Sequence, residues 1–136
     1  LAPLAGRWAG EANLLSPRPM LVHQTELVEF ALDGALLIVR GAGYDNPQHT
    51  GAPGFQALAV ISYNDARDNY EFRSYAMGHA STAIGEFLED GAFRWSLRPG
   101  GPVRIQYTIR VEGDVWTEVG EMSYDEGQTW TRTRAR

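Results

Sequence analysis

Short runs in which apolar and polar residues alternate make up most of this chain, and turn signals separate them. Four dipeptides that tolerate the positive φ of a tight hairpin lie between such runs: Asp33-Gly34, Asp90-Gly91, Gly113-Asp114 and Glu126-Gly127. Looser connections fall at 64–69 and 99–102. Between these signals the pattern predicts ten strands: Gly6–Ala12, Val22–Ala31, Ala35–Tyr44, Phe55–Tyr63, Asn69–Met77, Thr82–Glu89, Ala92–Leu97, Val103–Val111, Val115–Ser123 and Thr129–Arg136.

Consecutive strands without a convincing helix predict an antiparallel up-and-down meander. Such a meander has to hide its unpaired edges, and closure into a barrel is the simplest way to do so. We therefore predict an all-β fold, with residues 1–136 forming one antiparallel up-and-down β-barrel of about ten strands. A barrel of this strand number is wide enough to hold one small ligand.

The clearest alternation lies at 103–111, where apolar residues at odd positions are separated by polar ones. The same parity argument predicts a larger inward-facing set. It consists of Leu36, Ile38, Phe55, Ala57, Ala59, Ile61, Tyr70, Phe72, Ile84, Leu88, Phe93, Trp95, Leu97, Val103, Ile105, Tyr107, Ile109 and Val111.

Two segments interrupt the meander. Pro17 and Pro19 exclude 13–20 from the inside of a sheet or a regular helix, so we expect an irregular crossing near one mouth of the barrel. The polar segment 45–54 is longer than a hairpin needs. It is either a flap over the barrel entrance or an insertion tolerated at the surface.

Composition narrows the possible partners. The 136 residues are 43% hydrophobic and 21% charged, which is ordinary for a soluble globular protein, and no apolar run approaches the ~18 residues of a membrane helix. A formal net charge of -5 argues against nucleic acid. No cysteine is present, so disulfides and thiolate metal sites are excluded. The chain starts with Leu1, so we expect either a removed leader or a trimmed end. The expected location is cytoplasmic, periplasmic or secreted. The oligomeric state stays open, and a homodimer is one possibility.

No catalytic or metal-binding pattern stands out. His23, His49 and His79 are far apart and lack metal-ligand spacing. Glu26 and Glu29 point to opposite faces of one strand, and Glu118 and Glu121 are separated in the same way. A nucleophile elbow and a glycine-rich phosphate loop are both missing. We predict no catalytic residue, no metal and no cofactor.

Arginine side chains are the candidates for holding a polar ligand end. Arg40 shares parity with Leu36 and Ile38, so an inward Arg40 would anchor a carboxylate or phosphate, and Tyr44 would cap the same group. One alternative is that Arg40 lies near the rim of the barrel and reaches water. The other is that Arg40 pairs with Glu26 or Glu29 on the preceding strand and leaves nothing for a ligand.

The last strand offers a second basic candidate. Trp130, Arg132, Arg134 and Arg136 share a face, and Arg132 is a candidate for a ligand carboxylate. A frayed and solvated terminus is the competing explanation of the final two arginines.

The first predicted strand, Leu4-Ala5-Gly6-Arg7-Trp8-Ala9-Gly10-Glu11, resembles the Gly-x-Trp signature that opens the barrel of the calycins, which include lipocalins and fatty-acid-binding proteins. This resemblance implies that Trp8 plugs one end of a barrel. Together with Glu121-Met122-Ser123-Tyr124-Asp125 and the following Glu126-Gly127-Gln128-Thr129-Trp130, it is similar to a bacterial lipocalin-like family of unknown function. The size also resembles the ten-stranded haem-binding barrels of the nitrobindin type.

Departures from these families limit what the resemblance implies. Nitrobindin-type barrels bind haem through a late histidine, and here no histidine follows His79; Met122 and Tyr124 are the late residues that remain, so no haem is expected. Fatty-acid-binding proteins carry an Arg-x-Tyr pair on the last strand, whereas Arg132 is followed at that spacing by Arg134. Pro17 and Pro19 stand where their helical lid would begin.

The sequence therefore predicts a non-catalytic barrel that binds a small, largely apolar or amphipathic molecule in its interior. The expected lining is aromatic and basic: Arg40, Tyr44, Tyr70, Phe72, Trp95, Tyr107, Trp116 and Arg132. An enzyme of the isomerase or cyclase type that uses the same cavity is one alternative. A filled barrel that acts as a protein-interaction module is the other.

Overall fold

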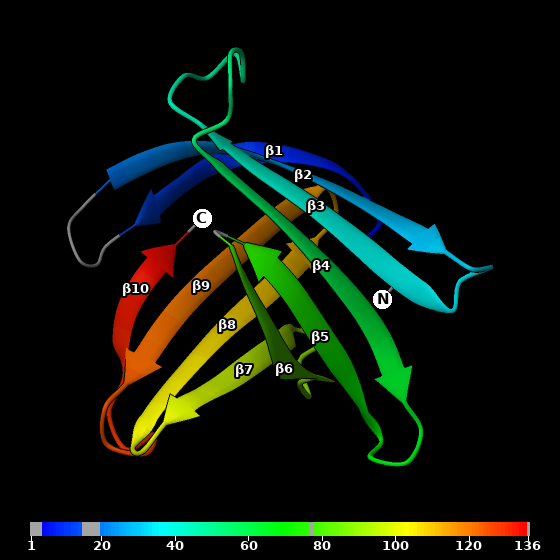
Figure 1. Ribbon diagram of the computed structural model, residues 1–136, viewed down its shortest axis with the longest axis vertical. Coiled ribbons are helices and arrows are strands. Elements are labelled where there is room, and N and C mark those ends of the chain that lie inside the picture. Colours follow the sequence, from blue (N-terminus) through cyan, green and yellow to red (C-terminus); the bar gives the residue numbers. More distant parts are fainter. Residues whose placement is uncertain (1–3, 15–19, 77, 136) are drawn as a thin grey trace.

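Ten strands form one continuous antiparallel sheet in the computed structural model, which describes residues 4–14, 20–76 and 78–135 (Figure 1). They are β1 (Gly6–Leu14), β2 (Met20–Ala31), β3 (Leu36–Tyr44), β4 (Phe55–Asn64), β5 (Asn69–Ala76), β6 (His79–Phe87), β7 (Phe93–Gly100), β8 (Val103–Glu112), β9 (Val115–Ser123) and β10 (Thr131–Ala135). Each strand pairs with its neighbours in chain order, which confirms the predicted meander. The predicted strand ends at Met77 and Arg136 lie outside the described residues.

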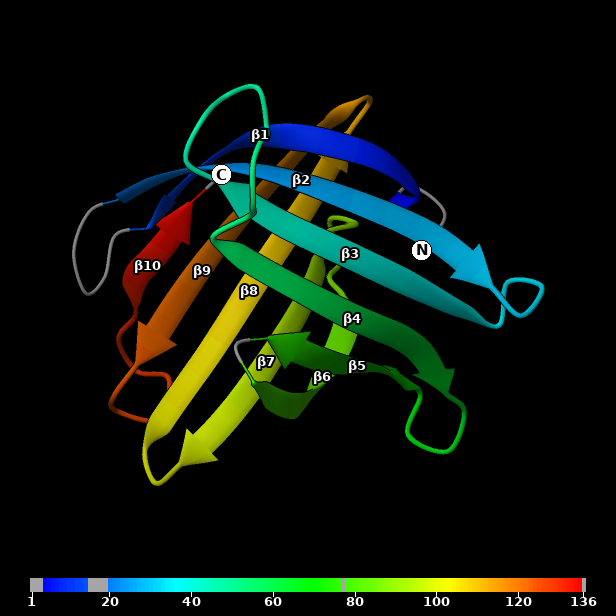
Figure 2. The ribbon, with the colours of Figure 1, turned by 45° about the horizontal axis from the view of Figure 1, so that its top comes forward.

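The sheet closes through a short seam between its first and last strands. β1 pairs with β2 along its whole length, but in the described part of the chain it pairs with β10 only at Asn13 and Leu14. β10 is short, as Figure 2 shows, and its register against β9 shifts between Arg132 and Arg134. The rest of β1 therefore lies opposite β9 with no strand between them.

Tight turns fall where the sequence predicts them. The β2–β3 connection carries positive φ at Leu32, Asp33 and Gly34, and the β8–β9 hairpin turns through Gly113 at φ 62°. These conformations explain the Asp33-Gly34 and Gly113-Asp114 signals, because Gly and Asp tolerate positive φ better than β-branched residues do.

Apolar side chains from most strands meet inside the barrel. The largest of the fully buried apolar side chains are Val28, Leu37, Ile61 and Phe93. The inward parity predicted for 55–61 on β4, for Phe93 to Leu97 on β7 and for Tyr107 to Val111 on β8 is confirmed. These residues build the wall of the interior cavity described below.

Parity was predicted wrongly on two strands. On β3 the inward residues are Leu37 and Val39, while Leu36 and Ile38 face outward. Residues 36–39 are all apolar, so alternation could not choose between the two faces. On β6 Ala83 is 3% exposed and Ile84 is 49% exposed, because small inner residues there make room for aromatic rings from neighbouring strands. The predicted inward Leu88 follows the end of β6.

The two interrupting segments differ from expectation in extent. β1 runs to Leu14 and β2 starts at Met20, so both ends of 13–20 are strand, while Pro17 and Pro19 lie outside the described residues. In Figures 1 and 2 the 45–54 connection rises beyond the ends of β3 and β4. Asn46 ties it together through Thr50, whose backbone N and Oγ1 both donate to Asn46 Oδ1.

The described residues contain no helix with the length and apolar character needed to cross a membrane.

Candidate functional site

The interior of the barrel holds a cavity of about 240 Å³. Its lining is largely aliphatic and aromatic, with three polar side chains, Glu26, Ser74 and Glu118. The lining residues are Leu4, Glu26, Val39, Gly41, Phe55, Ala57, Leu58, Ala59, Ile61, Phe72, Ser74, Ala76, Trp95, Tyr107, Ile109, Trp116 and Glu118. A mostly apolar hollow with a few polar groups is the usual character of a small-molecule site.

Three stacked rings form one wall of this cavity. Phe72 lies parallel to Trp95 with ring centroids 4.3 Å apart, and Trp95 lies nearly parallel to Tyr107 at 4.3 Å. Phe72 and Trp95 come from β5 and β7, on either side of β6. The inner face of β6 presents Ala83 and Gly85 at this level, so the two rings meet across it.

A second aromatic pair closes the side where β1 lies opposite β9. The rings of Trp8 and Trp116 meet edge to face at 5.4 Å, and Trp8 Nε1 donates to the carbonyl oxygen of Leu4 at 2.9 Å. Trp8 packs against the hydrophobic core, as does Trp116. This pair spans the part of the barrel wall that β10 does not reach.

The indole nitrogen of Trp95 is buried. Among the described residues it has no hydrogen-bond partner. Because a buried N–H without an acceptor is costly, an acceptor supplied by a ligand in this cavity would be favourable.

Two carboxylates reach the same cavity from strands far apart in the sequence. Glu26 extends from β2, and Glu118, which is 4% exposed, extends from β9. The sequence patterns that compare glutamates within one strand do not reveal this pair, because Glu26 lies on β2 and Glu118 on β9. The signal was present, since Glu118 shares parity with Trp116 and Glu26 shares parity with the buried Val28.

Gly41 makes room for the Glu26 carboxylate. A Cβ placed on Gly41 would lie 2.8 Å from Glu26 Oε2 and 3.2 Å from Oε1. Gly41 is paired with Glu26 across the β2–β3 ladder, so the side chain folds over its neighbour's backbone. Any larger residue at position 41 would push the carboxylate aside.

A second hollow, of about 280 Å³, lies between β1 and the start of β9. It is lined by Trp8, Ala9, Gly10, Glu11, Gln24, Glu26, Asp114, Val115 and Trp116. Glu26 and Trp116 line both this hollow and the interior cavity. The second hollow therefore adjoins the cavity on the side of the short seam.

Arg40 and Tyr44 lie on the outer face, so their predicted inward orientation is wrong. Arg40 Nη1 lies 3.4 Å from Glu29 Oε1, and both side chains are more than half exposed. Pairing with Glu29 is one of the two alternatives to an inward Arg40 that the sequence leaves open. The ring of Tyr44 contacts His49 edge to face at 5.6 Å. The cause is the parity error on β3, since Arg40 follows Ile38 to the outside.

The remaining predicted ligand residues divide between the cavity and other places. Phe72, Trp95, Tyr107 and Trp116 line the cavity. Tyr70 packs beside it, with edge-to-face contacts to Tyr63, Phe87 and Phe93. Whether these side chains bind a ligand stays a prediction.

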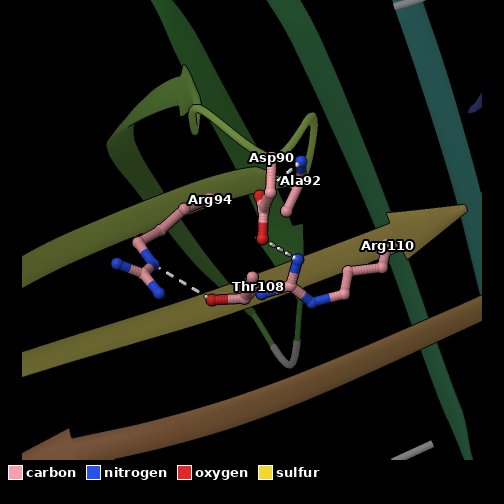
Figure 3. A network of polar contacts seen from close by, with 5 residues as sticks. All are labelled: Asp90, Ala92, Arg94, Thr108 and Arg110. Carbon is pink, nitrogen blue, oxygen red and sulfur yellow. Dashed lines mark hydrogen bonds and ion pairs between the residues drawn. The ribbon is translucent and has the colours of Figure 1, made fainter.

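Arg132 lies on the outer surface of β7–β10. There it lines a hollow of about 230 Å³ with Arg94, Thr108, Arg110, Thr117, Val119 and Glu121. Figure 3 shows the neighbouring network, in which Arg94 Nε donates to Thr108 Oγ1 at 3.0 Å and Arg110 pairs with Asp90. The hydrogen bond from Arg110 and a backbone bond from Ala92 lower the pKa of Asp90.

The Asp125–Trp130 segment, which carries part of the family resemblance, is a turn held by its own side chains. Asp125 accepts hydrogen bonds from Thr129 N at 2.8 Å and from Thr129 Oγ1 at 2.5 Å, and Ser123 Oγ donates to it at 2.7 Å. These bonds lower the pKa of Asp125 to about 2, with the Thr129 hydroxyl making the largest contribution. Trp130 Nε1 donates to Gly127 O. The residues of this motif are thus explained by the turn they build.

The described residues bring no three His, Asp or Glu side chains together in a way that could hold a metal ion. His23 lies on β2, His49 in the 45–54 connection and His79 at the start of β6.

Comparison of the chain with models of known protein families gives no match, and comparison with curated proteins gives none either.

Proposed function

We propose that this protein binds a small, largely apolar molecule inside its barrel and carries out no covalent chemistry on it. The observation that carries the proposal is the interior cavity of about 240 Å³ with the stacked wall of Phe72, Trp95 and Tyr107. At roughly 30 Å³ for each water-sized group, the cavity has room for a ligand of about eight such groups. Its aromatic surface supplies most of the binding free energy.

We also propose that the barrel is related to the lipocalin-like calycins, and to their bacterial family of unknown function in particular. Support comes from the Gly6-x-Trp8 signature at the start of β1, from the packing of Trp8 against the core and from the consecutive strand order. The proposed ligand and the proposed family are independent, because one fold can serve many functions.

A cavity enzyme is the second candidate, and the pair Glu26 and Glu118 is the observation that favours it. Two carboxylates at one cavity can divide the roles of general acid and general base. The two candidates differ in a simple observable. A binding protein releases its ligand with an unchanged covalent structure, whereas an isomerase or cyclase converts an added substrate into a different compound, which chromatography or NMR distinguishes even where the mass is the same.

A cavity-filling substitution tests the binding proposal. Ala57→Phe places a ring in the cavity, whereas Ala80→Phe places the same ring on the exposed outer face of β6. Calorimetric titration with 2-phenylethanol should show binding to the wild type and to Ala80→Phe, and loss of binding to Ala57→Phe with an unchanged circular dichroism spectrum. Equal binding by all three proteins would place the ligand elsewhere and overturn the proposal.

A further inference from the structure

The charge inside the cavity has one sign. Among the described residues that line it, the ionisable groups are Glu26, Glu118 and the phenol of Tyr107, and none is an arginine or histidine. Electrostatic complementarity between a site and its ligand sets which charge the site prefers. Two carboxylates and no arginine or histidine in the described lining give the cavity a negative potential, which favours a ligand with a positive charge over a neutral ligand of the same shape.

The hollow that adjoins the cavity between β1 and β9 is acidic as well. The hollow between β1 and β9 adds Glu11 and Asp114 to Glu26, and its described lining contains no arginine or histidine. Arginines lie on the outer face and around the turns, as Arg94 and Arg110 illustrate. Arg7 and Arg40 line a further hollow, of about 720 Å³, that shares Glu26 with the cavity. Charges of one sign along an entrance raise the local concentration of ligands of the opposite sign.

Aromatic rings complete the chemistry that such a ligand needs. Trp95 and Tyr107 line the cavity, and Trp8 and Trp116 line the hollow between β1 and β9. The faces of these rings attract cations, most strongly where water is excluded. Trp95 Nε1, buried and without a partner among the described residues, adds a place for one acceptor on the ligand.

We infer that the ligand of this cavity is a small protonated amine on a compact apolar body, which enters between β1 and β9. The inference rests on the proposed function. The ammonium group lies between Glu26 and Glu118 and donates charge-assisted hydrogen bonds to their carboxylates. The apolar body lies against the wall of Phe72, Trp95 and Tyr107, and an ether or hydroxyl oxygen on it can accept from Trp95.

Three probes of nearly equal size and different charge test this inference: 2-phenylethylamine, which is protonated at pH 7, 2-phenylethanol, which is neutral, and phenylacetate, which is an anion. Calorimetric titration of the wild-type protein should give an affinity for the amine that is roughly tenfold or more above that for the alcohol, because each charge-assisted hydrogen bond exceeds a neutral one. Phenylacetate should bind least. Added salt should weaken binding of the amine and leave the alcohol unchanged.

Variants of the two glutamates assign the preference to the cavity. Glu118→Gln and Glu26→Gln keep the side-chain shape and should each reduce the affinity for the amine by roughly tenfold, with the affinity for the alcohol unchanged. Glu89→Gln removes the same charge from the exposed β6–β7 connection and should change neither. Gly41→Ala should lower amine affinity without removing any charge, because its methyl group displaces the Glu26 carboxylate.

The outcomes separate this inference from the proposed function. Equal binding of the amine and the alcohol by the wild type overturns the inference and leaves apolar binding in place. Failure of all three probes to bind overturns both. A preference for the amine that survives in Glu118→Gln and in Glu26→Gln also overturns the inference, because the charge responsible would lie outside the cavity. If Glu118→Gln does not fold, the affinities of the wild type for the three probes and the amine affinity of Glu26→Gln test the inference.

Discussion

The ring of Phe93 occupies the space in which a side chain on Gly85 would begin, since a Cβ placed there would lie 2.5 Å from Phe93 Cζ. Phe93 is one of the most deeply buried side chains and packs in the core of the barrel. The backbone atoms of β6 thus form part of the surface against which this ring packs.

Gly85→Ala should destabilise the protein by about 1–3 kcal/mol, the usual range when atoms are added to a packed core. Urea unfolding monitored by circular dichroism would measure the loss. Gly10→Ala is the matched control, because a Cβ at Gly10 meets no atom within 4 Å. Combining Gly85→Ala with Phe93→Leu should cost less than the sum of the single changes. An unchanged free energy of unfolding in Gly85→Ala would contradict the packing described here.

Arg40→Leu should change the free energy of unfolding by less than about 1 kcal/mol, because the ion pair with Glu29 is exposed to solvent. Binding of 2-phenylethanol should stay as in the wild type, since position 40 faces away from the interior. The same two measurements, unfolding in urea and calorimetric titration, apply. Loss of binding in a folded Arg40→Leu protein would contradict the outward position of Arg40.

Asp125 should give the protein an acid-resistant turn between β9 and β10. Its pKa falls from 3.8 to about 2 in the folded protein, so its carboxylate stabilises the fold fully above pH 3.8 and loses this effect as the pH falls through about 2. The difference in thermal unfolding midpoint between wild type and Asp125→Asn should be largest near neutral pH and should shrink over that acid range. A carboxyl carbon NMR titration that places Asp125 near 3.8 would rule this out.

Tyr63 is the corresponding case at high pH. Its hydrogen bond to Asp68 raises the pKa of the phenol to about 12. The stabilisation from this bond is present below pH 10 and is lost as the pH rises through about 12. The ultraviolet difference spectrum between wild type and Tyr63→Phe should therefore show ionisation of this phenol near pH 12. Ionisation near pH 10 would mean that the bond to Asp68 is absent in solution.

The strand order was predictable because turn residues and alternation mark each strand independently of the rest of the chain. Where apolar and polar residues do not alternate, the packing of neighbouring strands decides which side chains of a strand face the interior. Residues 36–39 are uniformly apolar, so only the cavity wall selects Leu37 and Val39. On β6 the larger Ile84 faces outward, because Phe72 and Trp95 require a small residue between them.

The candidate site was predicted in its aromatic part and missed in its acidic part. Aromatic residues in strands with clear parity, such as Phe72, Trp95 and Tyr107, could be placed inside from the sequence. Glu26 and Glu118 are separated by most of the chain, and closure of the sheet alone brings them to one cavity. Parity with Val28 and with Trp116 indicates that each glutamate faces inward, but no local pattern shows that the two reach one cavity.

The short seam between β1 and β10 affects the behaviour of the protein at high concentration. Along most of β1, backbone groups that point away from β2 have no neighbouring strand in the described structure, so β1 is an edge strand within a closed sheet. Edge strands recruit strands from other molecules and can start aggregation. Charged side chains are a common protection, and β1 carries two exposed ones, Arg7 and Glu11. In a concentrated solution the charges of these two residues oppose the pairing of β1 with strands of other molecules.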